Sequence, residues 1–155
     1  MSYPTLRLHP RKEESILRFH PWVFSGAIAS ITDGKPQDGD LVEVLDARGS
    51  TLGVGHYATG SIAVRMLSFG RSEQIGRDFF RDRLRAALEL RASMGLIRPE
   101  GGPATPNTVY RLIHGEGDSL PGLIVDIYGD TAVMQAHSMG MHHSRELIAE
   151  ALMET

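Results

Sequence analysis

The chain has 155 residues, of which 41% are hydrophobic and 23% are charged, and its net charge is −3. These values are typical of one domain or two small ones, and they exclude a wholly disordered chain. The chain contains no Cys, which excludes a disulfide scaffold, a Cys-based zinc site and a Cys nucleophile. Because no apolar run approaches the ~18 residues of a membrane span and the N-terminus has no signal-peptide core, we expect a cytoplasmic protein without membrane contact.

The first part of the chain predicts a β-barrel-like module with one short helix over residues 1–68. The expected elements, in chain order, are a strand at 5–8, a helix at 11–19, a strand starting at 22–24, a strand at 26–31, a hairpin of 41–45 and 52–56, and a strand at 62–67. Gly49 suits the positive φ of the hairpin turn. Gly53 and Gly55 on one strand face predict a bend or a closely passing backbone. Trp22 and Phe24 are interpreted as core residues of this module.

A connecting segment with one long helix is expected at 69–95. Asp78 suits the N-cap and Gly95 the C′ position. An apolar stripe recurs at helical spacing, and it comprises Phe80, Leu84, Ala87, Leu88 and Met94. The arginines of this segment are placed on or near the other face, which is either solvated or in contact with RNA phosphates; they are Arg77, Arg81, Arg85 and Arg91.

The last part of the chain, 96–155, predicts a partial α/β unit. A Pro- and Gly-rich loop at 98–108 precedes strands at 109–114, 123–128 and 131–137, and Gly129-Asp130 forms a hairpin turn. A helix starting at Met141 or Ser144 runs to Met153 and is still apolar where the sequence stops. We therefore expect this unit to be incomplete. The fold class is α+β: a PUA-like small β-barrel, a helix, and an incomplete α/β unit with a β-hairpin.

Motifs for nucleotide binding and catalysis are weak. Neither glycine-rich stretch has a GxGxxG or GxxxxGK[ST] pattern between a strand and a helix, and no Ser lies in a GxSxG elbow. His114, Glu116 and Asp118 could hold a metal in one loop, although their spacing is more typical of a plain turn. We assign no catalytic residue and no metal ligand. A small metal-dependent hydrolase using these three residues stays open as a hypothesis.

Basic residues gather around the first predicted helix. Arg11, Lys12, Arg18 and His20 lie close in sequence to Trp22 and Phe24. Basic side chains interleaved with aromatic ones suit RNA, whose phosphates attract the former and whose bases stack on the latter. Of the sixteen basic residues only Lys12 and Lys35 are Lys. Arginine suits bidentate phosphate contacts, but a high arginine content is also common in proteins from GC-rich genomes.

Three stretches resemble one bacterial family: HPWVFSGAI at 20–28, GDLVEV at 39–44 followed by GxGxY at 53–57, and GEGDxLPGLIVDxYGD at 115–130. Together they resemble the S-adenosylmethionine-dependent 23S rRNA (cytosine-5) methyltransferases. That family has an N-terminal PUA domain, a small central α/β domain and a C-terminal Rossmann-like methyltransferase domain. The resemblance covers only the PUA domain and part of the central domain. It implies RNA contacts at Arg11, Lys12, Arg18, His20, Ser25 and Gly26, and a loop at Glu116 and Asp118 that faces another domain or the substrate strand.

The resemblance predicts that the chain recognises 23S rRNA as the N-terminal portion of a methyltransferase that forms 5-methylcytosine. The family's cytosine-attacking Cys has no counterpart here. S-adenosylmethionine is therefore expected only in the full-length family member, with no cofactor in this chain. The alternative is a stand-alone PUA-like RNA-binding or ribosome-associated module without catalytic activity. A homodimer is a further possibility, since it would cover the apolar end of the last helix.

Overall fold

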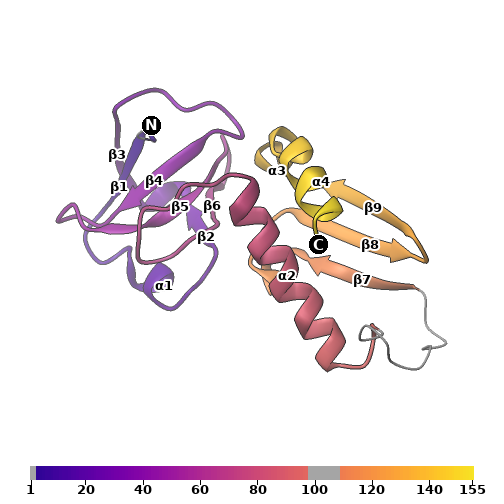
Figure 1. Cartoon of the computed structure of the whole chain (residues 1–155). Coiled ribbons are helices and arrows are strands. Elements are labelled where there is room, and N and C mark those ends of the chain that lie inside the picture. Colours follow the sequence, from indigo (N-terminus) through magenta and orange to yellow (C-terminus); the bar gives the residue numbers. More distant parts are fainter. Residues whose placement is uncertain (1–2, 98–108) are drawn as a thin grey trace. The chain divides into compact units, whose positions relative to one another are not determined.

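The computed structural model describes residues 3–97 and 109–155, and it divides the chain into two compact units, 1–74 and 75–155. Figure 1 shows a curled sheet with little helix in the first unit, and helices beside a small sheet in the second. The chain is thus an α+β protein, as predicted. The long helix, which the sequence assigns to a connecting segment, packs within the second unit. The predicted loop at 98–108 lies outside the described residues.

The first unit is built on one six-stranded sheet with the order β2-β6-β5-β4-β1-β3. Neighbouring strands are antiparallel except β1 and β4, which are parallel. The strands are β1 (Thr5–Leu8), β2 (Trp22–Phe24), β3 (Ile28–Thr32), β4 (Leu41–Leu45), β5 (Thr51–Tyr57) and β6 (Ile62–Met66). The predicted strand at 26–31 begins later, because Ser25–Ala27 form a 3₁₀ turn, η1.

Close backbone packing explains the glycines of β5. Val42 and Val44 of β4 are fully buried and pair in register with Gly55 and Gly53. A Cβ built on Gly53 would lie 2.0 Å from the carbonyl oxygen of Ser68, and one on Gly55 would lie 2.5 Å from a second backbone oxygen. A side chain therefore cannot fit at either position, and the predicted close approach of another backbone is confirmed.

The first helix, α1 (Glu14–Leu17), is a single turn and is shorter than predicted. It ends well before Pro21, because Phe19 turns left-handed with φ 62°. The amide of Phe19 donates to the carbonyl of Ile16, and the amide of His20 donates to the carbonyl of Ser15, both at 2.9 Å. This pair of bonds is a Schellman motif, which closes a helix C-terminus.

The second unit starts with α2 (Arg77–Ser93), whose Phe80, Leu84 and Ala87 are buried as the apolar stripe predicts. Met94, which was predicted on that stripe, is exposed. Asp78 lies in the first turn, and Gly76 is the N-cap. Gly95 occupies the C′ position with φ 75°, as predicted.

A three-stranded antiparallel sheet follows, with the order β7-β8-β9. Its strands are β7 (Val109–His114), β8 (Leu123–Tyr128) and β9 (Thr131–Ala136), and the predicted two-residue turn joins the last two. The last helical segment is broken into α3 (Met139–His143) and α4 (Arg145–Met153). Its start was predicted too late, because the Ser138 hydroxyl caps α3 by accepting the amide of Met141 at 3.3 Å. No helix of the described residues is long and apolar enough to span a membrane.

Candidate nucleic-acid interface

Strand β2 directs two aromatic side chains to the same side, opposite to its buried residue. Val23 lies in the core at 2% exposure, whereas Phe24 is 50% exposed and Trp22 is half-buried. The interpretation of both aromatics as core residues is therefore wrong for Phe24. The reason is the period of two along a strand, which puts residues 22 and 24 on one face and residue 23 on the other. The two rings lie edge to face, 6.4 Å apart.

The aromatics of β2 line a pocket together with α1 and η1. Its volume is about 310 Å³, and it is bounded by Lys12, Ser15, Ile16, Trp22, Val23, Phe24, Gly26 and Ala27. We call this feature the α1–β2 pocket. It includes two of the predicted RNA contacts, Lys12 and Gly26. A methyl group built on Gly26 would meet nothing within 4 Å, so the pocket is open at this residue.

Two further predicted contacts lie next to the α1–β2 pocket. The His20 ring packs 5.8 Å from Trp22 and 6.3 Å from Phe24, and its Nδ1 accepts the amide of Trp22 at 3.2 Å. Ser25 is exposed, and its amide donates to the carbonyl of Ser61 at 2.9 Å. The pocket thus has an aromatic wall, one lysine, and a histidine held against that wall.

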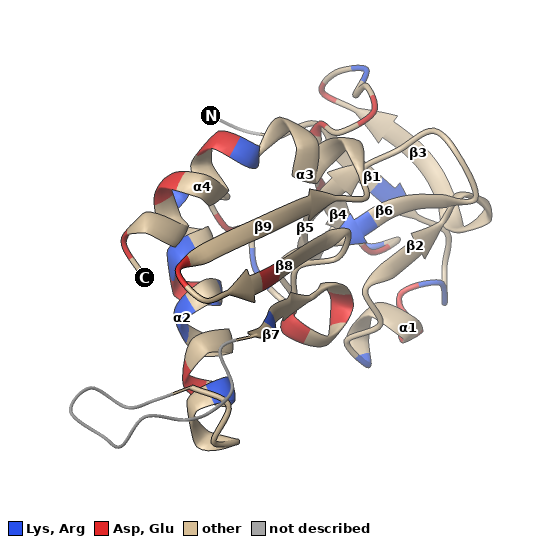
Figure 2. Cartoon of the chain, turned by 90° about the vertical axis from the view of Figure 1, so that its right-hand side faces the viewer, with Lys and Arg blue, Asp and Glu red and all other residues tan. Residues whose placement is uncertain are grey.

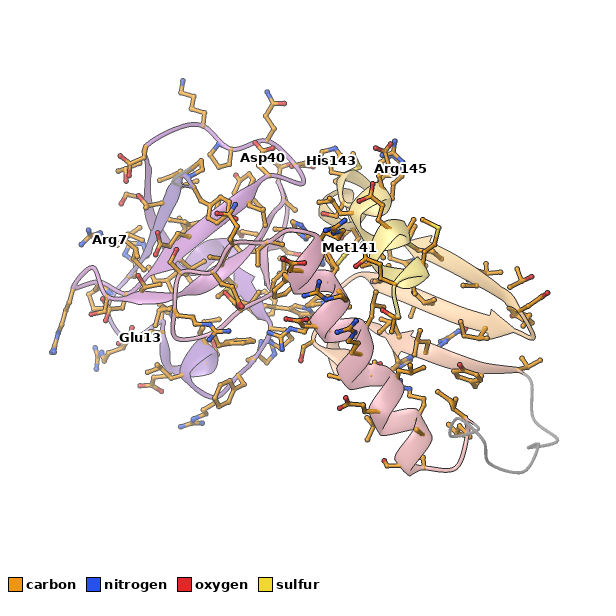
Figure 3. All side chains as sticks on the ribbon, viewed as in Figure 1. Arg7, Glu13, Asp40, Met141, His143 and Arg145 are labelled. Atoms are coloured by element: carbon orange, nitrogen blue, oxygen red, sulfur yellow. The ribbon has the colours of Figure 1, made fainter. Side chains whose placement is uncertain are left out.

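Arg11 belongs to a second pocket of about 420 Å³. This pocket also contains Glu13, which Figure 3 labels near α1, and residues of the β4–β5 turn. The turn is fixed by Asp46, whose carboxylate accepts the amides of Ser50 and Arg48 at 2.8 and 2.9 Å. These bonds, first that from Ser50, lower the pKa of Asp46. The structure therefore separates Arg11 from Lys12, although the two are adjacent in sequence.

Arg18 and Phe19 form the exposed end of α1. Arg18 is the C-cap residue and lines neither pocket. Phe19 follows it and is 73% exposed, with its ring 5.5 Å from that of Phe69 at an angle of 70°. Phe19 was not among the predicted contacts. No sequence signal marks it, since the left-handed C′ position usually carries Gly.

The loop after β7, η2 (Gly115–Asp118), is held from inside the second unit. Both terminal nitrogens of Arg91 donate to the carboxylate of Asp118, one of them at 2.7 Å, and Arg91 Nε donates to the carbonyl of Arg111 at 3.1 Å. Asp118 also accepts the amide of His114 at 2.6 Å. The placement of Arg91 on an outer helix face is therefore wrong. Glu116, the other acid of the loop, is exposed.

Most arginines of α2 are paired with acids of the same unit. Arg77 contacts Glu154 at 3.3 Å, and Arg81 contacts Asp78 at 2.7 Å. Figure 2 shows the acidic and basic residues interspersed along this helix. Such pairing leaves less positive potential for phosphates. The hypothesis that α2 binds RNA stays a prediction, and it now depends on the arginines other than Arg77, Arg81 and Arg91.

The loop after β7 carries the three residues of the metal-dependent hydrolase hypothesis, His114, Glu116 and Asp118. Within residues 3–97 and 109–155, no three His, Asp or Glu side chains come together as metal ligands would. The Asp118 carboxylate is bound by Arg91, as described above. On the neighbouring strands, Asp126 accepts from Arg111 Nε at 2.8 Å, and this bond lowers the pKa of Asp126.

Comparison with known proteins identifies the first unit. Residues 6–69 match the family of PUA-like domains. The first unit is a PUA-like domain. The ribosomal RNA large subunit methyltransferase I of Shewanella frigidimarina is 41% identical over 148 residues, which are 95% of this chain and 36% of that protein. The protein of the same name from Klebsiella pneumoniae is 38% identical over 151 residues, covering 97% of this chain and 36% of its own length.

Solved structures extend the likeness to the whole chain. A protein of Streptococcus mutans described as a SAM-dependent methyltransferase has the same fold over 99% of this chain and 38% of its own, with a TM-score of 0.77 and 18% identity. A methyltransferase structure complexed with SAH gives a TM-score of 0.78 at 18% identity, over 99% of this chain and 37% of its own. This chain spans about a third of the length of the curated relatives that it matches.

Proposed function

We propose that this chain is the RNA-recognition portion of an S-adenosylmethionine-dependent methyltransferase of 23S rRNA. The observation that carries the proposal is the α1–β2 pocket, where Lys12 and the rings of Trp22 and Phe24 line one opening of a PUA-like domain. The relatives named as ribosomal RNA methyltransferases support rRNA as the substrate class.

The chemistry of the pocket suits an unpaired nucleotide. Its volume of about 310 Å³ allows a single base to enter, and Phe24 offers an exposed ring on which a base can stack. Sequence-tolerant RNA binding combines such stacking with cationic contacts to the backbone. Lys12 would supply the phosphate contact, and His20, held against Trp22, would fix the aromatic wall. The same RNA strand is also proposed to contact Arg11, Arg18, Ser25 and Gly26.

The methyl transfer itself is assigned to the part of the relatives that this chain does not span. We propose 5-methylcytosine as the product, on the resemblance of three sequence stretches to the cytosine-5 family. That reaction uses a Cys to attack the base, and this chain has none. No residue here is therefore proposed as catalytic, and S-adenosylmethionine is proposed as the cofactor of the full-length protein.

A salt titration of RNA binding tests the proposal. Transcribed 23S rRNA fragments would be titrated with the 155-residue chain, and Kd measured at several salt concentrations. Phosphate contacts release counterions, so Lys12→Ala should weaken binding and reduce the slope of log Kd against log salt by about one. Lys35→Ala is the matched control, since Lys35 is an exposed lysine of the same unit that lines neither pocket.

Three outcomes would contradict the proposal or one of its parts. Absence of salt-dependent binding to rRNA would refute RNA recognition. Equal losses in the Lys12 and Lys35 variants would indicate a general charge effect and refute the pocket as the site. A calorimetric titration with SAH should give no binding heat, and binding would overturn the assignment of the cofactor to the rest of the full-length protein.

A further inference from the structure

Phe19 occupies a backbone position that disfavours its own side chain. It is the C′ residue of the Schellman motif that ends α1, with φ 62°. Helix α2 ends in the same way, with Gly95 at φ 75° and bonds of 3.0 Å from Gly95 to Ala92 and from Leu96 to Arg91. Left-handed backbone is strained for residues with a Cβ and is an outlier for bulky ones. The backbone conformation at position 19 therefore favours Gly, but the residue is Phe.

Burial does not offset this strain. The Phe19 side chain is 73% exposed, and its ring contact is the edge-to-face pair with Phe69. Such a pair occupies no more than one face of the Phe19 ring, so the other face stays open. Strained residues that gain little from packing concentrate at functional sites. An open aromatic face on a rigid turn is also the arrangement that stacks unpaired bases.

The charges beside Phe19 favour a nucleic acid. Arg18 precedes it and is exposed, and Lys12, which lies before the N-cap of α1, is exposed as well. The acidic residues of this segment are Glu13, which lines the second pocket, and Glu14, which lies in the first turn of α1. The aromatic ring thus follows directly after a cation, as in binding surfaces that hold a backbone and stack its bases.

We infer that Phe19 is a stacking platform for an unpaired base of the bound RNA, separate from the α1–β2 pocket. The inference rests on the proposed function and deepens it, because it predicts that the chain selects RNA with unpaired nucleotides over duplex RNA. The Schellman motif fixes the backbone that carries the ring, and the pair with Phe69 orients the ring, so little ordering is needed when the base arrives.

Fluorescence anisotropy with two RNAs tests the inference. One is a labelled hairpin with an unpaired loop, and the other is the fully paired duplex of the same composition. Phe19→Leu keeps an apolar side chain at the same backbone position but removes the ring. It should weaken hairpin binding by about 5- to 150-fold, the range for loss of one base stack. Phe19→Trp should retain hairpin binding.

The salt dependence separates stacking from electrostatics. The slope of log Kd against log salt should be unchanged in Phe19→Leu, because no phosphate contact is lost. Tyr128→Leu is the matched control: it removes a ring that is 52% exposed in the second unit, and it should leave hairpin binding unchanged. Thermal melting followed by Trp22 fluorescence checks that the first unit of each variant is folded.

The outcomes distinguish this inference from the proposed function. If the unmodified chain binds the hairpin and Phe19→Leu binds it equally well, the stacking platform is refuted and RNA recognition stands. Equal losses for hairpin and duplex would also refute it, since a duplex offers no unpaired base. If the unmodified chain binds neither rRNA nor the hairpin, the proposed function fails and this inference fails with it.

Discussion

The ion pair between Arg91 and Asp118 should dominate the stability of the second unit. Their side chains are 10% and 5% exposed. Replacing Asp118 by Ala would leave the guanidinium without its carboxylate, and the amide of His114 without its acceptor. Removing one partner of a buried pair costs about 3–5 kcal/mol. A unit of this size has a free energy of unfolding of only about 4–12 kcal/mol, so Asp118→Ala should remove a quarter of it or more.

The assay can follow the two units separately. The only Trp of the chain, Trp22, lies in the first unit, so its fluorescence reports that unit. The helical circular dichroism signal comes mainly from the second unit, which holds α2 and α4. Urea unfolding of Asp118→Ala should shift the helical transition to lower urea and leave the fluorescence transition in place.

A double variant tests whether the loss in Asp118→Ala comes from the unpaired charge of Arg91. Apolar residues can replace a buried ion pair at little cost, so Arg91→Met combined with Asp118→Leu should be more stable than either single variant. A loss below about 1 kcal/mol in Asp118→Ala would refute a buried pair, because solvent-exposed pairs contribute only that much. Additive losses in the double variant would refute coupling between the two side chains.

Three further predictions concern single residues. Arg111 lowers the pKa of Asp126. The pair therefore stabilises the fold at pH values above the ordinary Asp pKa, and this contribution is lost as the pH falls through the lowered pKa. The difference in melting temperature between the unmodified chain and Asp126→Asn should shrink from pH 7 to pH 3. Gly53→Ala places a methyl carbon 2.0 Å from a carbonyl oxygen and should strongly lower the Trp fluorescence midpoint in urea, whereas Gly60→Ala, whose methyl meets nothing within 4 Å, should not. Phe19→Gly should change the free energy of unfolding by less than about 1.5 kcal/mol, since relief of about 1–2 kcal/mol of backbone strain offsets the loss of a ring pair worth about 0.5–1.5 kcal/mol. A loss above about 3 kcal/mol in urea unfolding would refute the strain.

Local patterns were sufficient to predict most strands. The strand at 41–45 and the Gly129-Asp130 turn both depend on neighbours in sequence, and both predictions are confirmed. The alternation around buried Val23 also indicates the exposure of Phe24, whereas the aromatic character of Phe24 alone favours the core.

Helical spacing indicates that Arg91 is buried, although its charge favours an exposed position. Arg91 lies four residues after Ala87 and seven after Leu84, so helical spacing places it on the buried stripe. Its partner Asp118 lies far along the chain, and no local pattern indicates a pairing across that separation. Phe19 was unpredictable for another reason, because its conformation is set by the end of α1 and contradicts its own propensity.

The position of β2 in the sheet has a consequence for how the protein is made. This strand is at the sheet edge, and its neighbour is β6, with Trp22 opposite Arg65. The aromatic wall therefore cannot form while the ribosome is still synthesising the residues before β6. Pairings this distant in sequence also slow folding. The α1–β2 pocket can therefore be completed only after β6, which ends at Met66, has been synthesised.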